Sequence, residues 1–171
     1  MAICGSDEAD GRALRELLIA MPNLRNCEHE LTSAPTREYN CIAYAAGDDE
    51  KWWWPPHPDD VDLDLSFWPA GVPADITLEA FSAAFATRGF SPCGDGGFAH
   101  GVEKIALFYN DHRTPTHAAR QIFEGPYRGH WISKLGMLAD IRHKELIAVE
   151  CSEYGSNKRF FSRPTTSKPT D

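Results

Sequence analysis

The residues best suited to chemistry are a cysteine and a histidine that lie far apart in the sequence. Cys41 opens a short helical stretch at residues 40–47, and Asn40 directly before it is a favourable N-cap residue. His117 stands at the head of a strand-like run, residues 116–121. A helix N-terminus lowers the pKa of a thiol, and an imidazole can accept its proton. Together the two residues predict a thiol nucleophile with its base.

The strand that carries His117 and its neighbour supply further candidates. A third polar group normally fixes the orientation of a catalytic imidazole. Ser133 is placed for this role on the next expected strand, and Asp140 is the chemically stronger but more distant alternative. Side chains alternate along a strand, so Gln121 shares the face of His117 and is a candidate substrate-binding residue. Arg120 points to the other face, where we expect it to form an ion pair.

Substrate contacts are also expected near Cys41. Its backbone N–H and the side chain of Asn40 or Tyr39 are candidates for an oxyanion hole. Three adjacent indoles in the run of residues 52–56 cannot all face one core, which makes Trp53 a candidate platform for a substrate or anchor for a protein partner. The alternative is a lid over the core with one exposed ring.

The surrounding pattern predicts helices first and a sheet second. Leucines at helical spacing favour a helix over residues 9–21, and Thr77 is a good N-cap for a second helix that ends near residue 88. Three strand-like runs then follow, at residues 104–109, 116–123 and 130–134. Two successive hairpins would make an antiparallel meander. The fold class expected is α+β, with N-terminal helices packed on a small antiparallel sheet.

The remaining segments complete a single domain over residues 1–162. Residues 23–39 and 48–75 are expected to be irregular, the latter because prolines disfavour regular structure. A short helix near residues 146–151 and an edge strand at residues 159–161 are expected to follow. Residues 163–171 are rich in Pro, Thr and Ser and are expected to form a disordered tail.

Composition excludes several classes of function. The chain has 171 residues, 42% of them hydrophobic, which suits one ordinary core. A net charge of -8 argues against nucleic-acid binding, and no apolar run approaches the roughly 18 residues of a membrane span. Five cysteines without a Cys-x-x-Cys pair suggest reduced thiols in a cytoplasmic protein, with specialised export left open. We expect no cofactor, and a zinc site from Cys41, His117 and a carboxylate is a minor alternative.

Three sequence motifs together resemble known families. They are Asn40-Cys41-Ile42-Ala43, His117-Ala118-Ala119-Arg120-Gln121 and Trp131-Ile132-Ser133-Lys134-Leu135-Gly136. Their order is similar to the papain-like cysteine hydrolases in the broad sense, which include cell-wall amidases, CHAP-type amidases and transglutaminase-like proteins. With Trp52-Trp53-Trp54-Pro55 they look closer still, over residues 38–143, to an uncharacterised bacterial family that brings no established activity. The first resemblance implies a papain-like core, although that pattern usually has His, Asn, Asp or Gln where this chain has Ser133.

Two functions are consistent with the sequence. The first is a cysteine hydrolase or acyltransferase, of peptidase, amidase or deamidase type, that acts on a peptide, amide or protein substrate through Cys41 and His117. The second is a non-enzymatic immunity or accessory protein that uses a degenerate papain-like scaffold to bind a protein partner.

Overall fold

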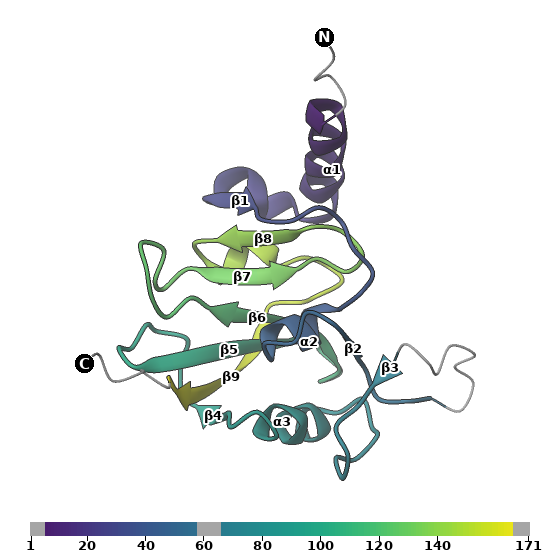
Figure 1. Ribbon diagram of the computed structural model, residues 1–171, viewed down its shortest axis with the longest axis vertical. Coiled ribbons are helices and arrows are strands. Elements are labelled where there is room, and N and C mark those ends of the chain that lie inside the picture. Colours follow the sequence, from purple (N-terminus) through teal and green to yellow (C-terminus); the bar gives the residue numbers. More distant parts are fainter. Residues whose placement is uncertain (1–5, 58–65, 166–171) are drawn as a thin grey trace.

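The computed structural model describes residues 6–57 and 66–165 (Figure 1). In these ranges helices and an antiparallel sheet combine, so the predicted α+β class is confirmed. The acidic run at residues 59–64 and most of the predicted tail lie outside the described residues. The helical segments are α1 (Ser6–Ala20), the 3-10 helix η1 (Pro22–Asn26), α2 (Cys41–Ala45), α3 (Leu78–Ala86) and the 3-10 helix η2 (Leu146–Val149).

Seven strands form one antiparallel sheet in the order β1-β8-β7-β6-β5-β9-β4, and two very short strands, β2 and β3, pair in parallel beside it. Strands β5, β6 and β7 are consecutive neighbours and form the predicted meander, and β8 extends it by a strand that the sequence analysis did not predict. The strands are β1 (His29–Leu31), β2 (Trp52–Trp53), β3 (Ser66–Phe67), β4 (Ser91–Cys93), β5 (Val102–Tyr109), β6 (Pro115–Gln121), β7 (Trp131–Lys134), β8 (Asp140–His143) and β9 (Asn157–Pro164).

Two sequence expectations about the last strand are wrong. The run at residues 159–161 lies in β9, which pairs with β5 along eight residues and with β4 on its other side, so it is not an edge strand. Strand β9 also continues to Pro164, so the expected tail cannot begin at residue 163. The physical reason is the burial of β5. Its six central residues are buried, so the backbone N–H and C=O groups along both of its edges need hydrogen-bond partners, and β9 supplies them along one edge.

The two helices nearest the sheet begin where their N-caps predict. The side chain of Asn40 accepts the backbone N–H of Ala43 at 3.0 Å at the start of α2. Thr77 accepts the backbone N–H of Ala80 at 3.1 Å at the start of α3. Each cap satisfies an N–H that has no partner within its own helix, so these starts follow from local chemistry.

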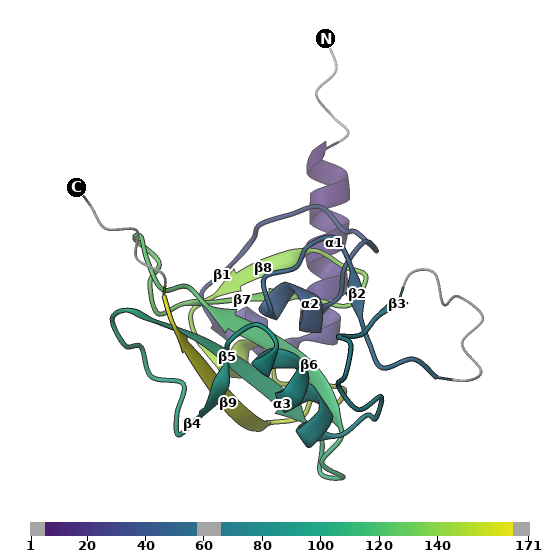
Figure 2. The ribbon, with the colours of Figure 1, turned by 60° about the horizontal axis from the view of Figure 1, so that its bottom comes forward.

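The sheet is covered on both faces. Helices α2 and α3 pack with alternate residues of β5, such as Leu107, to form one core cluster. The C-terminal part of α1, with η1 and η2, packs with the intervening residues, such as Phe108, to form the second. Figures 1 and 2 show α2 against the meander, whereas α1 projects past the β1 edge. None of the helices in the described part of the chain is long and apolar enough to span a bilayer.

Candidate active site

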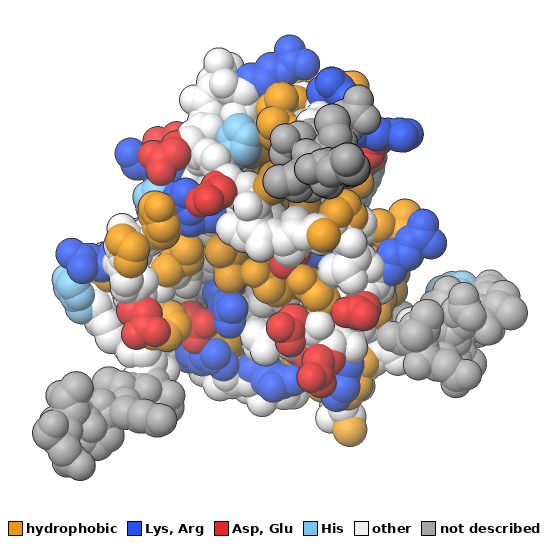
Figure 3. Space-filling model, turned by 45° about the horizontal axis from the view of Figure 1, so that its top comes forward, with side chains coloured by type: hydrophobic (Ala, Val, Ile, Leu, Met, Phe, Trp, Pro, Cys, Tyr) orange, Lys and Arg blue, Asp and Glu red, His pale blue; other side chains and the backbone are white. Residues whose placement is uncertain are grey.

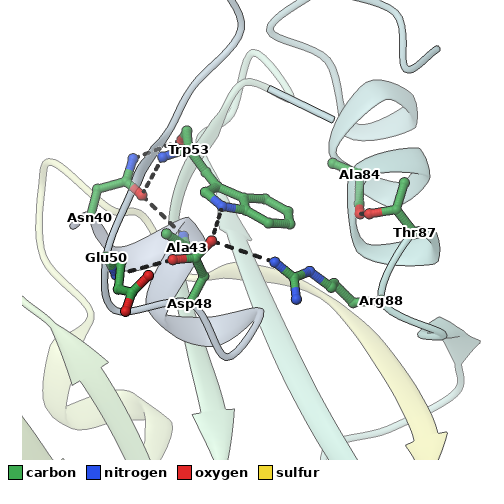
Figure 4. A network of polar contacts seen from close by, with 8 residues as sticks. All are labelled: Asn40, Ala43, Asp48, Glu50, Trp53, Ala84, Thr87 and Arg88. Atoms are coloured by element: carbon green, nitrogen blue, oxygen red, sulfur yellow. Dashed lines mark hydrogen bonds and ion pairs between the residues drawn. The ribbon is translucent and has the colours of Figure 1, made fainter. Parts of the chain in front are cut away.

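A hydrogen-bonded clamp fixes the N-terminus of α2. The amide oxygen of Asn40 accepts the backbone N–H of Trp53 at 3.2 Å as well as that of Ala43, and its amide nitrogen donates to the Trp53 carbonyl at 2.7 Å (Figure 4). Asn40 is 4% exposed. The side chain therefore joins α2 to β2, and its predicted contribution to an oxyanion hole stays a prediction.

Cys41 stands directly after this clamp with 9% of its surface exposed. Burial raises the pKa of its thiol to about 11, because a thiolate loses hydration there. The backbone N–H groups of Ala118, Ile42 and Cys41 itself oppose this shift, as does the charge of Lys134. The sulfur therefore rests as a neutral thiol, among groups that would stabilise negative charge developing on it.

His117 begins a buried chain of hydrogen bonds on the neighbouring strands. Its Nε2 lies 3.1 Å from Ser133 Oγ, which lies 2.9 Å from His143 Nε2. His143 Nδ1 in turn lies 2.9 Å from the backbone carbonyl oxygen of Glu145. The contact predicted between Ser133 and His117 is thus present, and His143 extends it.

The direction of these hydrogen bonds follows from the Glu145 carbonyl group at the end of the series. A carbonyl oxygen only accepts, so His143 Nδ1 carries the proton and its Nε2 is an acceptor. Ser133 then donates to His143 and accepts from His117 Nε2–H. A neutral imidazole has one N–H, so His117 Nδ1 holds an unprotonated lone pair. This atom is buried and has no hydrogen-bond partner among the described residues.

The charge state agrees with this assignment. Burial and, to a smaller extent, the nearby His143 lower the pKa of His117 to about 3. Burial likewise lowers the pKa of His143 to about 4, although its bond to the Glu145 carbonyl acts in the opposite direction. Both rings are therefore neutral near pH 7, which the chain of hydrogen bonds requires.

Cys41 and His117 belong to different layers of the core, because Cys41 packs in the cluster that contains α2 and Leu107, whereas the His117 ring packs against Phe108 of the other cluster. The backbone of Ala118, the residue after His117, lies near the Cys41 thiol and lowers its pKa. The Tyr154 ring stacks on the His117 ring, with centroids 4.1 Å apart and planes within 5°. No hydrogen bond joins Cys41 to His117 in the described structure, and alternation along β6 directs the His117 side chain to the face opposite the one that Ala118 shares with Cys41.

A cavity of about 300 Å³ opens beside the sulfur, and no charged side chain is among its lining residues. Trp52 and Trp54 line it, whereas Trp53 is fully buried and donates its indole N–H to Asp48 at 2.9 Å (Figure 4). The prediction that chose Trp53 as the platform is corrected to its two neighbours, because alternation turns them the other way. The lining residues are Asn40, Cys41, Trp52, Trp54, Thr116, Gly136 and Tyr154.

Two other predicted site residues lie elsewhere. Asp140 accepts a hydrogen bond from the Tyr39 hydroxyl at 2.6 Å, and no bond to His117 is formed, so it does not orient the imidazole. Tyr39 is thereby engaged with Asp140, and its predicted oxyanion role is not supported. Gln121 donates to the Gly96 carbonyl at 2.9 Å and lines a different cavity. It shares the face of His117 but stands four residues along, roughly 13 Å away at 3.3 Å per residue.

Several residues of the site were missed from the sequence. Lys134 is fully buried beside Cys41, and its ammonium donates to the carbonyls of Gly136, at 2.9 Å, and Leu138. Burial lowers the pKa of Lys134, while the charges of Asp140 and Cys41 oppose the shift. In the sequence, the only indication that Lys134 belongs to the site was its position next to Ser133. The described residues contain no group of three His, Cys, Asp or Glu side chains that could hold a metal ion.

Comparison with known proteins places the chain in a family. A family model described as Domain of unknown function (DUF7689) matches residues 30–162. The chain belongs to this family. The DUF7689 match begins within β1 and ends within β9, so it contains the candidate site and leaves out α1. No curated protein and no solved structure matches the chain.

Proposed function

We propose that this chain is a cysteine hydrolase or acyltransferase on a papain-like core, with Cys41 as the nucleophile and His117 as its general base. The observation that supports this most strongly is the unprotonated, unpartnered Nδ1 of the buried His117. Leaving a buried acceptor without a partner costs about 1–3 kcal/mol, so a function that uses the lone pair accounts for its retention. The cysteine at a helix N-terminus, packed against an antiparallel sheet that carries the histidine, supports the papain-like core.

The proposed chemical step uses a neutral pair and requires His117 Nδ1 to come within hydrogen-bond reach of the Cys41 sulfur. As the Cys41 sulfur attacks a carbonyl carbon, the S–H proton moves to His117 Nδ1 and an S–C bond forms. Ser133 accepts the Nε2–H bond of the resulting imidazolium. His117 then returns the proton to the leaving amine, alcohol or thiol as its bond to the carbonyl carbon breaks. Water or another nucleophile finally takes the acyl group from sulfur, and its proton returns by way of His117 to the thiolate.

The cavity indicates which part of a substrate is held. Trp52, Trp54 and Tyr154 supply aromatic walls, and the lining includes no charged group. Such walls favour an uncharged, largely apolar segment next to the carbonyl, as in a peptide or amide with a hydrophobic side chain. The backbone N–H groups that surround the sulfur are the available donors for the developing oxyanion.

The test is acylation by a simple activated ester, p-nitrophenyl acetate. We expect a burst of p-nitrophenol and an acetyl group on Cys41, located by mass spectrometry of peptides. The burst should be lost in Cys41→Ala and slowed by about 100-fold or more in His117→Gln, since a general base contributes at least that much. Cys151→Ala removes a thiol outside the site and should behave as wild type.

A second candidate function is favoured by the low exposure of Cys41 and the missing bond to His117. On a degenerate papain-like scaffold, the cavity would hold an apolar side chain of a protein partner between Trp52 and Trp54. The same experiment separates the two functions. Acetylation of Cys41 at the same rate in wild type and His117→Gln would contradict the hydrolase and leave the binding protein.

A further inference from the structure

A second cavity, of about 640 Å³, lies away from Cys41 and has a different chemistry. Three arginines line it: Arg88 just after α3, Arg120 on β6 and Arg163 on β9. One carboxylate, that of Glu103 on β5, faces these three guanidinium groups within the lining. The whole chain carries a net charge of -8, so this local excess of positive charge runs against the overall balance. Figure 3 shows acidic and basic side chains intermixed on one face of the molecule.

Packing holds the arginines in fixed positions. Arg120 lies 3.3 Å and Arg163 2.7 Å from the two oxygens of Glu103, whose side chain is only 6% exposed. The Arg163 guanidinium also lies over the Phe90 ring, 4.3 Å from its centroid. Pairing on one side and stacking on the other orient the planar fork before any ligand binds, which lowers the entropic cost of binding.

The third arginine is fixed separately. Arg88 lies 3.4 Å from Asp48 and 5.2 Å from the centre of the Trp53 ring (Figure 4). Its side chain is 40% exposed, compared with 24% for Arg120. The cavity is thus a partly desolvated concavity in which three guanidinium groups are paired with two carboxylates, Glu103 in the lining and Asp48 outside it, and the remaining positive charge attracts anions.

We propose that this cavity binds a phosphate-bearing small molecule. Planar guanidinium groups match phosphate oxygens in bidentate geometry, and a phosphate group offers three acceptor oxygens to the three guanidinium groups, whereas a carboxylate offers two. Phe123 in the lining offers an apolar surface for the organic part of the ligand. This site is independent of the reaction proposed for Cys41.

The experiment is calorimetric titration of the full chain with inorganic pyrophosphate at low salt, with acetate as the monovalent comparison. Wild type should bind one pyrophosphate, more tightly than acetate and more weakly as salt is added. Arg120→Gln and Arg163→Gln should each weaken binding about tenfold or more, the effect of a lost charged hydrogen bond. Arg25→Gln removes an exposed arginine on η1 and should bind as wild type.

Two further variants distinguish a loss of pyrophosphate binding from a loss of the fold. Arg88→Gln changes the most exposed of the three arginines, so it should fold and still bind several-fold more weakly. Glu103→Gln removes the competing carboxylate and should tighten binding, with circular dichroism to verify the fold. Absence of saturable binding in wild type, or unchanged affinity in both Arg88→Gln and Arg163→Gln, would overturn the proposal.

Discussion

Mild acid is expected to destabilise this fold through the two buried histidines, His117 and His143. The ordinary histidine pKa is 6.5, and burial lowers it to about 3 and about 4 in the folded chain. Below pH 6.5 the two histidines therefore bind protons in the unfolded chain but not in the folded one. The free energy of unfolding then decreases as the pH falls, until the pKa values of the folded state are reached. Within this window each buried ring lowers the free energy of unfolding by about 1.4 kcal/mol per pH unit. Because the loss begins near pH 6.5, the two rings together lower it by about 4 kcal/mol between pH 7 and pH 5.

Urea denaturation at pH 7, 6 and 5 measures this loss directly. Carboxylates of ordinary pKa remain largely ionised over this range, so the histidines dominate the change. In His143→Gln the loss should fall to about 2 kcal/mol, whatever the stability at pH 7. His112→Gln changes an exposed histidine and should keep the full loss. A wild-type loss below about 1 kcal/mol, or the same loss in His143→Gln, would refute the assignment of neutral buried rings.

Three substitutions test the packing around the site. Ser133→Ala leaves two buried imidazole nitrogens without their partner and should lower the free energy of unfolding by about 2–4 kcal/mol. The control, Ser162→Ala on β9, should change it by under about 0.5 kcal/mol in the same denaturation assay. Trp53→Ala should cost about 3–5 kcal/mol because the indole is fully buried; a cost under about 1 kcal/mol would show that Trp53 is not part of the core. Lys134→Met removes a charge that lowers the pKa of Cys41, so iodoacetamide labelling of that thiol should shift to higher pH, and an unchanged pH profile would exclude this contribution.

Much of the framework could be predicted because local signals determine it. The capping preference of Asn40 fixes the start of α2, and alternating strands with short turns give the meander. The meander then determines register: Ala119 pairs with Ser133, which brings Ser133 beside the same face as His117. Side chains alternate along β6, so Arg120 points to the face opposite His117, where it forms the expected ion pair with Glu103.

The remaining features depend on contacts that no local pattern reveals. His143 joins the hydrogen-bond chain only because β8 pairs with β7, and Tyr154 reaches His117 from the loop before β9. Asp140 looked the stronger orienting group by chemistry, but its strand position directs the carboxylate to Tyr39. Adjacent indoles are equally apolar in sequence, whereas the hydrogen bonds of Trp53 to Asn40 and Asp48, which hold it in the core, become visible only in the structure.

The neutral state of Cys41 and His117 sets a particular expectation for reactivity. A preformed thiolate would react with iodoacetamide below neutral pH, but a thiol whose pKa is raised to about 11 holds little thiolate there. An ester gives a different result, because proton transfer to His117 accompanies formation of the S–C bond and no free thiolate is needed. Slow alkylation is therefore compatible with fast, His117-dependent acylation, and the proposed hydrolase predicts that combination. Fast alkylation at pH 6 that His117→Gln abolishes would instead show a preformed ion pair and contradict the neutral assignment.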